Sequence, residues 1–389
     1  MNLRDGRCVR RVAAAAAVAL TALMVPAGAA NGPSLRVALV QGGDLVVVDL
    51  ATGAKNVTLR HSGAGPLHWS ADRRRVSSAG RIAGGPTLST SDIAWAPSGE
   101  TAAYVTRRKG VSLWSPHGSR RLEPDGWGAT SLAWSTDGRL AIGRTLYRGN
   151  PRHEEIWIWN GRALSLAFSF GTGGPEPYPV TWQGNKVVWW DYPDSASIAA
   201  DGVSLYVNQT KVGATLMYRD FVSSCGRRLA FAEGGDRFAT HGKRIVVGGR
   251  DRSRDSSRSW VSPACNAGGT LLVAAAGRNW EEDRFGREHR AIWELLPIRR
   301  QLTHPPVGWT DESPQVLADG SILFVRTRQT SRKVGGKYYV TEHAELERLS
   351  NRTLKPVANM GYTANVSSAL GYANYYGHYG WPSLIAVAP

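Results

Sequence analysis

The feature that most constrains the fold of this chain is a strand–turn–strand unit that recurs along it. In the clearest copy, residues 132–142, Trp134 ends an apolar strand, Asp137-Gly138 supplies a turn, and Leu140 and Ile142 belong to the next strand. A two-residue hairpin turn needs positive φ, which Gly adopts without steric cost. One hairpin is only marginally stable in water, so the significance of the unit lies in its repetition.

A second clear copy covers residues 93–105, with Trp95 before Pro97-Ser98-Gly99. Weaker copies lie at residues 180–190, 222–231, 261–273 and 313–325, the last with Asp319-Gly320 at its turn. Trp95 and Trp134 are 39 positions apart, and Trp134 and Trp182 are 48 apart. A period of roughly 40 to 50 residues that holds several short strands predicts the blades of a β-propeller.

The Trp-Ser-x-Asp-Gly turn followed by a short apolar strand resembles the repeat of TolB-like β-propellers, the WD40-like Pro-Asp repeat family. It also resembles the propeller domain of prolyl oligopeptidases. The resemblance implies an all-β chain with a single propeller of four-stranded blades over residues 31–389. No Gly-x-Ser-x-Gly nucleophile elbow occurs in the sequence, so the likeness to the peptidases concerns their non-catalytic part, without the hydrolase domain.

The number of blades depends on the segment around Trp69. Trp69 lies only 26 positions before Trp95, which is short for four strands, so this copy is either truncated or the remainder of the first blade. We expect seven blades, with six or eight as alternatives. The last strands leave no room for a complete blade, so the N- and C-terminal strands together are expected to close the ring.

Residues 1–30 have the pattern of a secretory signal peptide. A head with four arginines precedes an apolar run over residues 12–25 and the small residues 27–29. The run is shorter than the roughly 20 residues that span a bilayer, and the alternative is an uncleaved N-terminal anchor. We expect a secreted or periplasmic protein with no transmembrane segment after cleavage, and no lipoprotein cysteine because Cys8 precedes the apolar run.

Two cysteines remain after removal of the leader, Cys225 and Cys265, at nearly equivalent points of consecutive repeats. An even number of cysteines in an oxidising compartment favours a disulfide, here one that joins two blades. The alternative is two separate thiols.

The charge of the chain is strongly positive, with a formal net charge of +16 that becomes about +13 without the leader. A basic exported protein adheres to anionic polymers, acidic lipid headgroups or stray nucleic acid. The arginines are scattered and accompany no nucleic-acid motif, so no specific nucleic-acid partner is expected.

One loop has the composition of a contact surface. Trp280, Arg284, Phe285 and Arg287 stand together within residues 279–289, and aromatic and Arg side chains are enriched at recognition hot spots. The alternative is that the aromatic rings pack beneath the loop. The Tyr-rich residues 371–381 either line the channel or pack against the closing blade.

Catalytic and metal motifs are absent from the sequence. His153-Glu154-Glu155 and His343-Ala344-Glu345 place His near carboxylates, but without the spacing that sets two zinc ligands on one helical face. On a strand, His343 and Glu345 would point the same way, an arrangement that could support a metal ion and is kept as the alternative. Asp137 and Asp319 are explained as turn residues. We therefore expect no catalytic residues, no metal site and no cofactor.

The resulting prediction is a monomeric, non-enzymatic scaffold that binds an unknown protein partner in the cell envelope. TolB has a separate N-terminal α/β domain, whereas propeller strands are expected here from about Leu35. The first alternative is a propeller-type carbohydrate-active enzyme, a glycoside hydrolase or lyase with acid and base residues from different blades. The second is adhesion to an anionic cell-wall polymer.

Overall fold

The computed structural model describes residues 35–62, 65–90, 93–146, 153–171, 176–192, 202–234, 238–279, 289–334, 337–364 and 383–389. The predicted signal peptide and the Tyr-rich residues 371–381 lie outside these ranges. Leu35–Pro389 forms one compact unit, separate from Met1–Ser34. The compact unit contains every strand given below.

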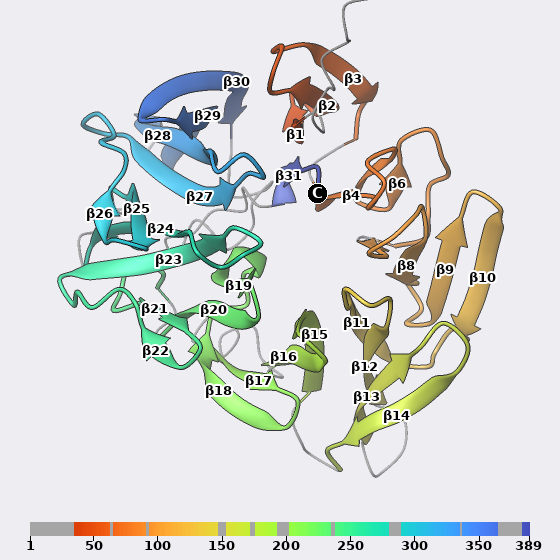
Figure 1. The fold of residues 1–389 in the computed structure, drawn as a ribbon. Helices are drawn as coiled ribbons and strands as arrows, with labels where there is room; N and C mark the ends of the chain where they lie inside the picture. Colours follow the sequence, from red (N-terminus) through yellow and green to blue (C-terminus); the bar gives the residue numbers. More distant parts are fainter. Residues whose placement is uncertain are drawn as a thin grey trace, which may run out of the picture. The chain divides into compact units, whose positions relative to one another are not determined.

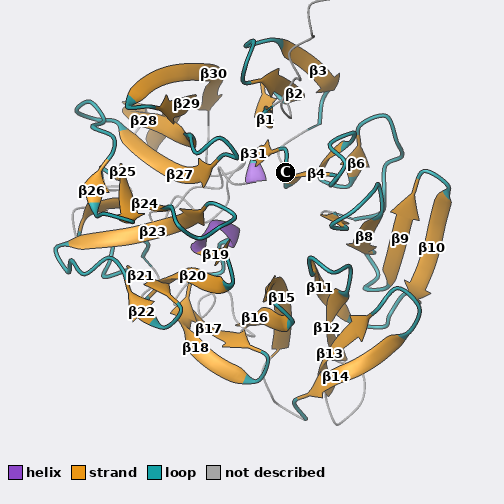
Figure 2. Cartoon of the chain, in the orientation of Figure 1, coloured by secondary structure: helices purple, strands orange, loops and turns teal. Residues whose placement is uncertain are grey.

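The described residues form eight antiparallel sheets, which we number as blades (Figures 1 and 2). Blade 1 contains β31 (Ile385–Val387), β1 (Arg36–Gln41), β2 (Asp44–Asp49) and β3 (Lys55–Leu59). Blade 2 contains β4 (Leu67–Trp69), β5 (Val76–Ser78) and β6 (Arg81–Ile82). Blade 3 contains β7 (Ala94–Trp95), β8 (Ala102–Val105), β9 (Val111–Ser115) and β10 (Gly118–Glu123). Blade 4 contains β11 (Ala129–Trp134), β12 (Leu140–Leu146), β13 (His153–Trp159) and β14 (Leu164–Ser169).

The remaining four blades also have four strands each. Blade 5 contains β15 (Glu176–Gln183), β16 (Lys186–Tyr192), β17 (Val203–Val207) and β18 (Thr210–Thr215). Blade 6 contains β19 (Val222–Cys225), β20 (Arg228–Glu233), β21 (Arg244–Val247) and β22 (Arg250–Asp251), and the short 3₁₀ helix η1 (Arg219–Phe221) precedes it. Blade 7 contains β23 (Arg258–Cys265), β24 (Leu272–Arg278), β25 (Ala291–Leu296) and β26 (Arg300–Gln301). Blade 8 contains β27 (Thr310–Val316), β28 (Ile322–Val334), β29 (Lys337–Ser350) and β30 (Thr353–Ala364).

The blades form a closed ring because each contacts the next and the last contacts the first. The contacting strand pairs are β31–β4, β4–β7, β7–β11, β11–β15, β15–β19, β19–β23, β23–β27 and β30–β1. Seven of these pairs join the inner strands of neighbouring blades, which Figure 1 shows around the centre of the ring. The predicted β-propeller is therefore confirmed.

The favoured number of seven blades is wrong, because the described residues form a ring of eight, which was one of the two alternatives. Of the two alternatives for the segment around Trp69, the truncated copy is the one that the structure contains: it is a three-stranded sheet of its own, not the remainder of blade 1. After β6 the chain returns through Gly84-Gly85-Pro86 in place of a fourth strand, with Leu88 and Ile93 buried. A blade without its outer strand fits the spacing of 26 residues between Trp69 and Trp95.

The ring is closed within blade 1, as predicted. The C-terminal strand β31 pairs with β1, so that Ala38 lies opposite Ala386 and Leu39 opposite Ile385. Half of the residues of β1 and of β2 are buried, including adjacent residues that point to opposite faces, which is the pattern of strands covered on two faces. The closure pairs the edge of the first blade with the last strand of the chain and so removes a site of strand addition.

The hydrophobic core lies between the blades as well as within them. One cluster joins Phe221 before blade 6, Trp260 of blade 7 and Phe324 of blade 8, all nearly inaccessible to solvent. A second joins Val37 and Leu39 of blade 1 to Val325 and Leu346 of blade 8. Burial of both faces of each sheet fixes the blades against one another.

The tryptophans of the repeat bond each blade to the one before it. We call Trp69, Trp95, Trp134 and Trp182 the inter-blade tryptophans. Trp134 Nε1 donates to Ala94 O at 2.9 Å, Trp182 Nε1 to Ala133 O at 2.8 Å, and Trp69 Nε1 to Ala386 O at 2.9 Å. Trp95 Nε1 donates to Ser77 Oγ at 3.1 Å. The residue that marks the repeat in the sequence therefore stabilises the contacts between blades 1 to 5.

Candidate functional site

The two ends of the propeller differ in the length of their connections. In an antiparallel blade, successive connections alternate between the ends, so the first-to-second and third-to-fourth connections share one end. These are short, for example residues 135–139 and 351–352, and we call this the turn end. The opposite end carries two-residue connections at 42–43 and 79–80 but also the long connections that follow strands of blades 6 and 7, residues 234–243, 279–290 and 302–309, and we call it the loop end. Loops on a rigid scaffold are the usual place of binding residues.

The loop over residues 279–290 is anchored at both of its described ends. Asn279 Oδ1 accepts a hydrogen bond from Gly242 N of the blade 6 loop at 2.7 Å. At the other end the fully buried Arg290 donates its backbone N–H to Thr310 Oγ1 of blade 8 at 2.7 Å. The loop therefore starts and ends on fixed positions between blades 6 and 8.

The four predicted contact residues, Trp280, Arg284, Phe285 and Arg287, lie outside the described residues. Their role in partner contact stays a prediction.

Next to the anchored loop, one face of blade 8 carries a group of charged side chains. We call Asp311, Arg326, Arg328, His343, Glu345 and Glu347 the blade 8 polar cluster. The strand register places Arg326 opposite Asp311 on one side and Glu345 on the other. Directly opposed residues share a face of the sheet, so residues distant in sequence meet on this face.

The strongest contact of the cluster is the ion pair between Arg326 and Asp311. Arg326 Nε and Nη2 donate to the two carboxylate oxygens at 2.7 and 2.9 Å. Asp311 is inaccessible to solvent, and its hydrogen bonds raise the pKa of Arg326 above its ordinary value. A bidentate pair of this kind fixes both the charge and the orientation of the guanidinium.

Glu347 differs from the other carboxylates of the cluster. It is 5% exposed, and burial raises the pKa of its carboxyl although the nearby Arg326 acts in the opposite direction. Among the described residues its Oε2 has no hydrogen-bond partner. This carboxyl can therefore hold a proton at a higher pH than an exposed glutamate.

The cluster reaches the surface through His343 and Trp309. His343 Nε2 lies 2.9 Å from Glu345 Oε1, which agrees with the expectation that both side chains point the same way. The ring of Trp309 packs edge-on against His343, with centroids 5.5 Å apart, and Arg328 lies 5.0 Å from the centroid of Trp309. The result is a half-buried aromatic and polar surface at the loop end of blade 8.

Sequence reasoning found only part of this arrangement. His343, Glu345 and Glu347 alternate along one strand, which predicts that all three side chains lie on one face of the sheet. The first two were identified from the sequence, whereas Glu347 was not. Asp311 and Arg326 join the cluster through strand register, which no local motif reports. In the other His–Glu segment, residues 153–155, the carboxylate has partners within its own blade. Glu155 accepts hydrogen bonds from Arg144 Nη1 at 2.8 Å and from Trp157 Nε1 at 2.7 Å in blade 4.

The repeat-turn residues lie at the turn end, where they organise hairpins. Gly138 and Gly320 have φ of +85° and +81°, values that favour glycine. Asp137 accepts hydrogen bonds from Arg139 and Ser135, and these lower the pKa of its carboxyl to about 2. Asp319 accepts from Ser321 N at 3.0 Å and pairs with Arg348.

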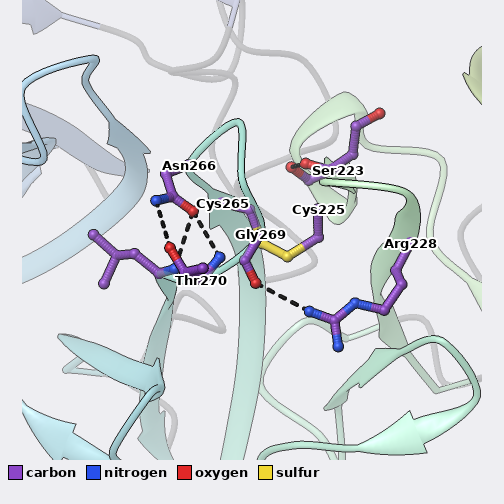
Figure 3. Close-up of a disulfide and its surroundings, with 9 residues drawn as sticks. Ser223, Cys225, Arg228, Cys265, Asn266, Gly269 and Thr270 are labelled. Carbon is purple, nitrogen blue, oxygen red and sulfur yellow. Dashed lines mark hydrogen bonds between the residues drawn. A yellow bond between two sulfur atoms is a disulfide. The ribbon is translucent and has the colours of Figure 1, made fainter.

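The structure contains the predicted disulfide between Cys225 and Cys265 (Figure 3). It joins the ends of the inner strands of blades 6 and 7 at the turn end. Arg228 Nη2 donates to Gly269 O across the same junction at 3.0 Å, as Figure 3 shows. The disulfide therefore fixes the two blades that support the anchored loop.

Among the described residues, no group of three His, Cys, Asp or Glu side chains is arranged to hold a metal ion. A search of the same residues finds no helix long and apolar enough to cross a membrane.

No protein-family model and no curated protein matches the sequence. Solved structures with similarity include an acylaminoacyl peptidase from Pyrococcus horikoshii, at 12% identity and a TM-score of 0.46, over 81% of this chain and 48% of the peptidase. The chain thus spans about half the length of that enzyme.

Two further structures are similar over most of both chains. A protein assigned as TolB from Agrobacterium tumefaciens has 10% identity and a TM-score of 0.38, over 92% of this chain and 99% of that one. AztD from Citrobacter koseri has 14% identity and a TM-score of 0.32, over 85% and 95%. At these identities the likeness concerns the fold alone.

Proposed function

We propose that this chain is a non-enzymatic, exported β-propeller scaffold that binds a protein partner of the cell envelope at its loop end. The observation that carries the proposal is the contrast between the short hydrogen-bonded turns of one end and the long connections of blades 6 and 7 at the other, one of them on fixed supports. The loop with Trp280, Arg284, Phe285 and Arg287 starts and ends on anchored residues. Rigid supports reduce the entropy lost when a loop binds.

Export is supported by the disulfide and by the sequence of the leader. Disulfides persist in oxidising compartments and are rare in the cytosol, and Cys225 and Cys265 form one. Both observations support our proposal that the protein is exported to the periplasm or outside the cell.

The test is an affinity capture with residues 31–389 from detergent-solubilised envelope extracts of the host, at low and high salt. The loop variant Trp280→Ala/Arg284→Ala/Phe285→Ala is compared with Arg162→Ala/Leu166→Ala, which removes an exposed arginine and an exposed apolar side chain from blade 4. A protein enriched at both salts by the wild type and the control, and at least about tenfold less by the loop variant, supports the proposal.

Equal capture by the loop variant would overturn the proposed surface. Capture of polyanions alone, lost at high salt, would replace a specific partner with charge-driven adhesion.

A second candidate function is a carbohydrate-active enzyme, and Glu347 is the observation that favours it. A buried carboxyl with a raised pKa has one property of a general acid. Release of reducing ends or unsaturated sugars from envelope polysaccharides, lost in Glu347→Gln, would support this candidate. Absence of release by the wild type would remove it.

A further inference from the structure

The turn end carries exposed aliphatic side chains next to basic ones on three consecutive blades. Ile298 is 68% exposed beside Arg299 in blade 7, Leu354 is 38% exposed in blade 8, and Val57 is 47% exposed in blade 1. Arg352 and Lys355 flank Leu354, and Lys55 precedes Val57, all of them exposed. We call these residues the apolar–basic arc: Lys55, Val57, Ile298, Arg299, Arg352, Leu354 and Lys355.

The topology places the arc at one end and on the outer side of the ring. Ile298, Arg299 and Arg352 lie in connections between the third and fourth strands of their blades. Leu354 and Lys355 lie at the start of the fourth strand β30, and Lys55 and Val57 lie in the fourth strand β3. The order of each sheet makes these the outer strands, and blades 7, 8 and 1 are consecutive (Figure 1). Arg348 Nη1 donates to Leu50 O at 3.0 Å, which joins blades 8 and 1 at this end.

The anions near the arc are already engaged, whereas three of its four cations contact no carboxylate among the described residues. Asp49 accepts from Ala51 N and Thr52 N in its own turn, and Glu294 pairs with Arg300 at 2.7 Å. In the described part of the chain, the side chains of Lys55, Arg352 and Lys355 make no hydrogen bond or ion pair. Arg299, the fourth cation, donates to the carbonyls of Ser253 and Arg254, at 2.7 and 3.1 Å, and its charge also acts on the carboxylate of Asp255.

We infer that the apolar–basic arc binds the surface of a bilayer that contains anionic lipids. A surface that offers both aliphatic side chains and unpaired cations suits a membrane interface, where the first enter the acyl boundary and the second meet the headgroups. A soluble polyanion would engage the cations but would leave Ile298, Leu354 and Val57 in water. The aliphatic component therefore favours lipid over polymer.

The test measures co-sedimentation of residues 31–389 with vesicles of phosphatidylcholine, with and without phosphatidylglycerol. This part contains every described strand of the closed ring, and it lacks the apolar leader, which would bind vesicles by itself. We expect binding that requires phosphatidylglycerol and weakens with salt. The triple variant Lys55→Gln/Arg352→Gln/Lys355→Gln should bind the vesicles about 100-fold more weakly than the wild type, because each lost positive charge is expected to lower the affinity about fivefold.

The aliphatic component is tested with Ile298→Ser, which should weaken vesicle binding about tenfold. The matched control is Val307→Ser at the loop end, where Val307 is fully exposed and has no basic neighbour in sequence. This control should bind like the wild type. Circular dichroism and thermal midpoints establish that each variant is folded.

Three outcomes would overturn the inference: no binding to vesicles, equal binding without phosphatidylglycerol, or equal loss in Val307→Ser. If Ile298→Ser binds like the wild type and soluble dextran sulfate displaces the protein from vesicles, the arc recognises charge alone and its ligand is a polymer. The protein-binding proposal concerns the opposite end and is unaffected by any of these results.

Discussion

Blades 1 to 5 and blades 6 to 7 are joined at the turn end through different side chains. In the first region, each inter-blade tryptophan donates its indole N–H to the preceding blade. In the second, the disulfide between Cys225 and Cys265 makes the connection. The first region needs no particular redox state, whereas the second needs an oxidising compartment.

The two kinds of connection occupy the same place in the repeat. Trp134 lies opposite Leu140 in its hairpin, and Cys265 lies opposite Leu272. The next residue begins the turn in both blades, with Ser135 N donating to Arg139 O and Asn266 N to Leu271 O. Cys265 therefore stands where the repeat elsewhere has tryptophan, and it reaches back to the preceding blade in the same direction.

The largest effect is expected from removal of the disulfide. Cys225→Ala/Cys265→Ala should lose about 4 kcal/mol of unfolding free energy, because the bond closes a loop of 40 residues in the unfolded chain. Denaturant titration without reductant measures the loss, and the wild type with reductant should show a similar one. If the double variant matches the oxidised wild type, the disulfide is not what joins these blades.

A smaller loss is expected in the tryptophan region. Trp182→Phe keeps an aromatic ring but removes the hydrogen bond to Ala133 O and weakens the contact with Arg139, which lies 4.8 Å from the ring centroid. We expect a loss of about 2 kcal/mol. The loss should be the same with and without reductant, and a loss that depends on reductant would contradict the division into two regions.

The sharpest comparison exchanges one connection for the other. Cys225→Ala/Cys265→Trp restores the repeat residue at the equivalent position in blade 7. It should regain about 1 kcal/mol relative to Cys225→Ala/Cys265→Ala, the value of a typical net hydrogen bond. If it is less stable than the double alanine variant, the site of Cys265 does not accommodate the indole and the equivalence is limited to the backbone.

The comparison also shows which features of the fold and of the blade 8 polar cluster could be predicted from the sequence. Trp95 and Trp134, with Asp137-Gly138, were enough to predict a propeller because turn chemistry and strand pattern are local. The favoured blade count was wrong because the spacing before Trp95 fits both a truncated blade and the remainder of the first blade, and the sequence does not decide between them. The blade 8 polar cluster was largely missed because Asp311, Arg326 and Glu347 meet through strand register rather than through a motif.

The smallest effect concerns the turns that follow the two kinds of connection. The turn after Trp134 is held by an ionised Asp137, whereas the turn after Cys265 is held by the neutral Asn266, whose Oδ1 accepts from Thr270 N and Leu271 N. Arg139 and Ser135 lower the pKa of Asp137 from 3.8 to about 2. A lowered folded-state pKa adds stability above the unfolded value, and this stability is lost as pH falls from about 4 to 2.

In Asp137→Asn, the free energy of unfolding should therefore fall less between about pH 4 and 2 than in the wild type. Thermal unfolding between pH 2 and 6 measures this difference. The Asp137 side chain is 58% exposed, so solvent screening limits the effect to less than about 1 kcal/mol. Asn266→Ala serves as the control, because loss of its neutral hydrogen bonds should shift stability equally at every pH. An equal fall in Asp137→Asn and the wild type would mean that Arg139 and Ser135 contribute no net stabilisation through this carboxylate.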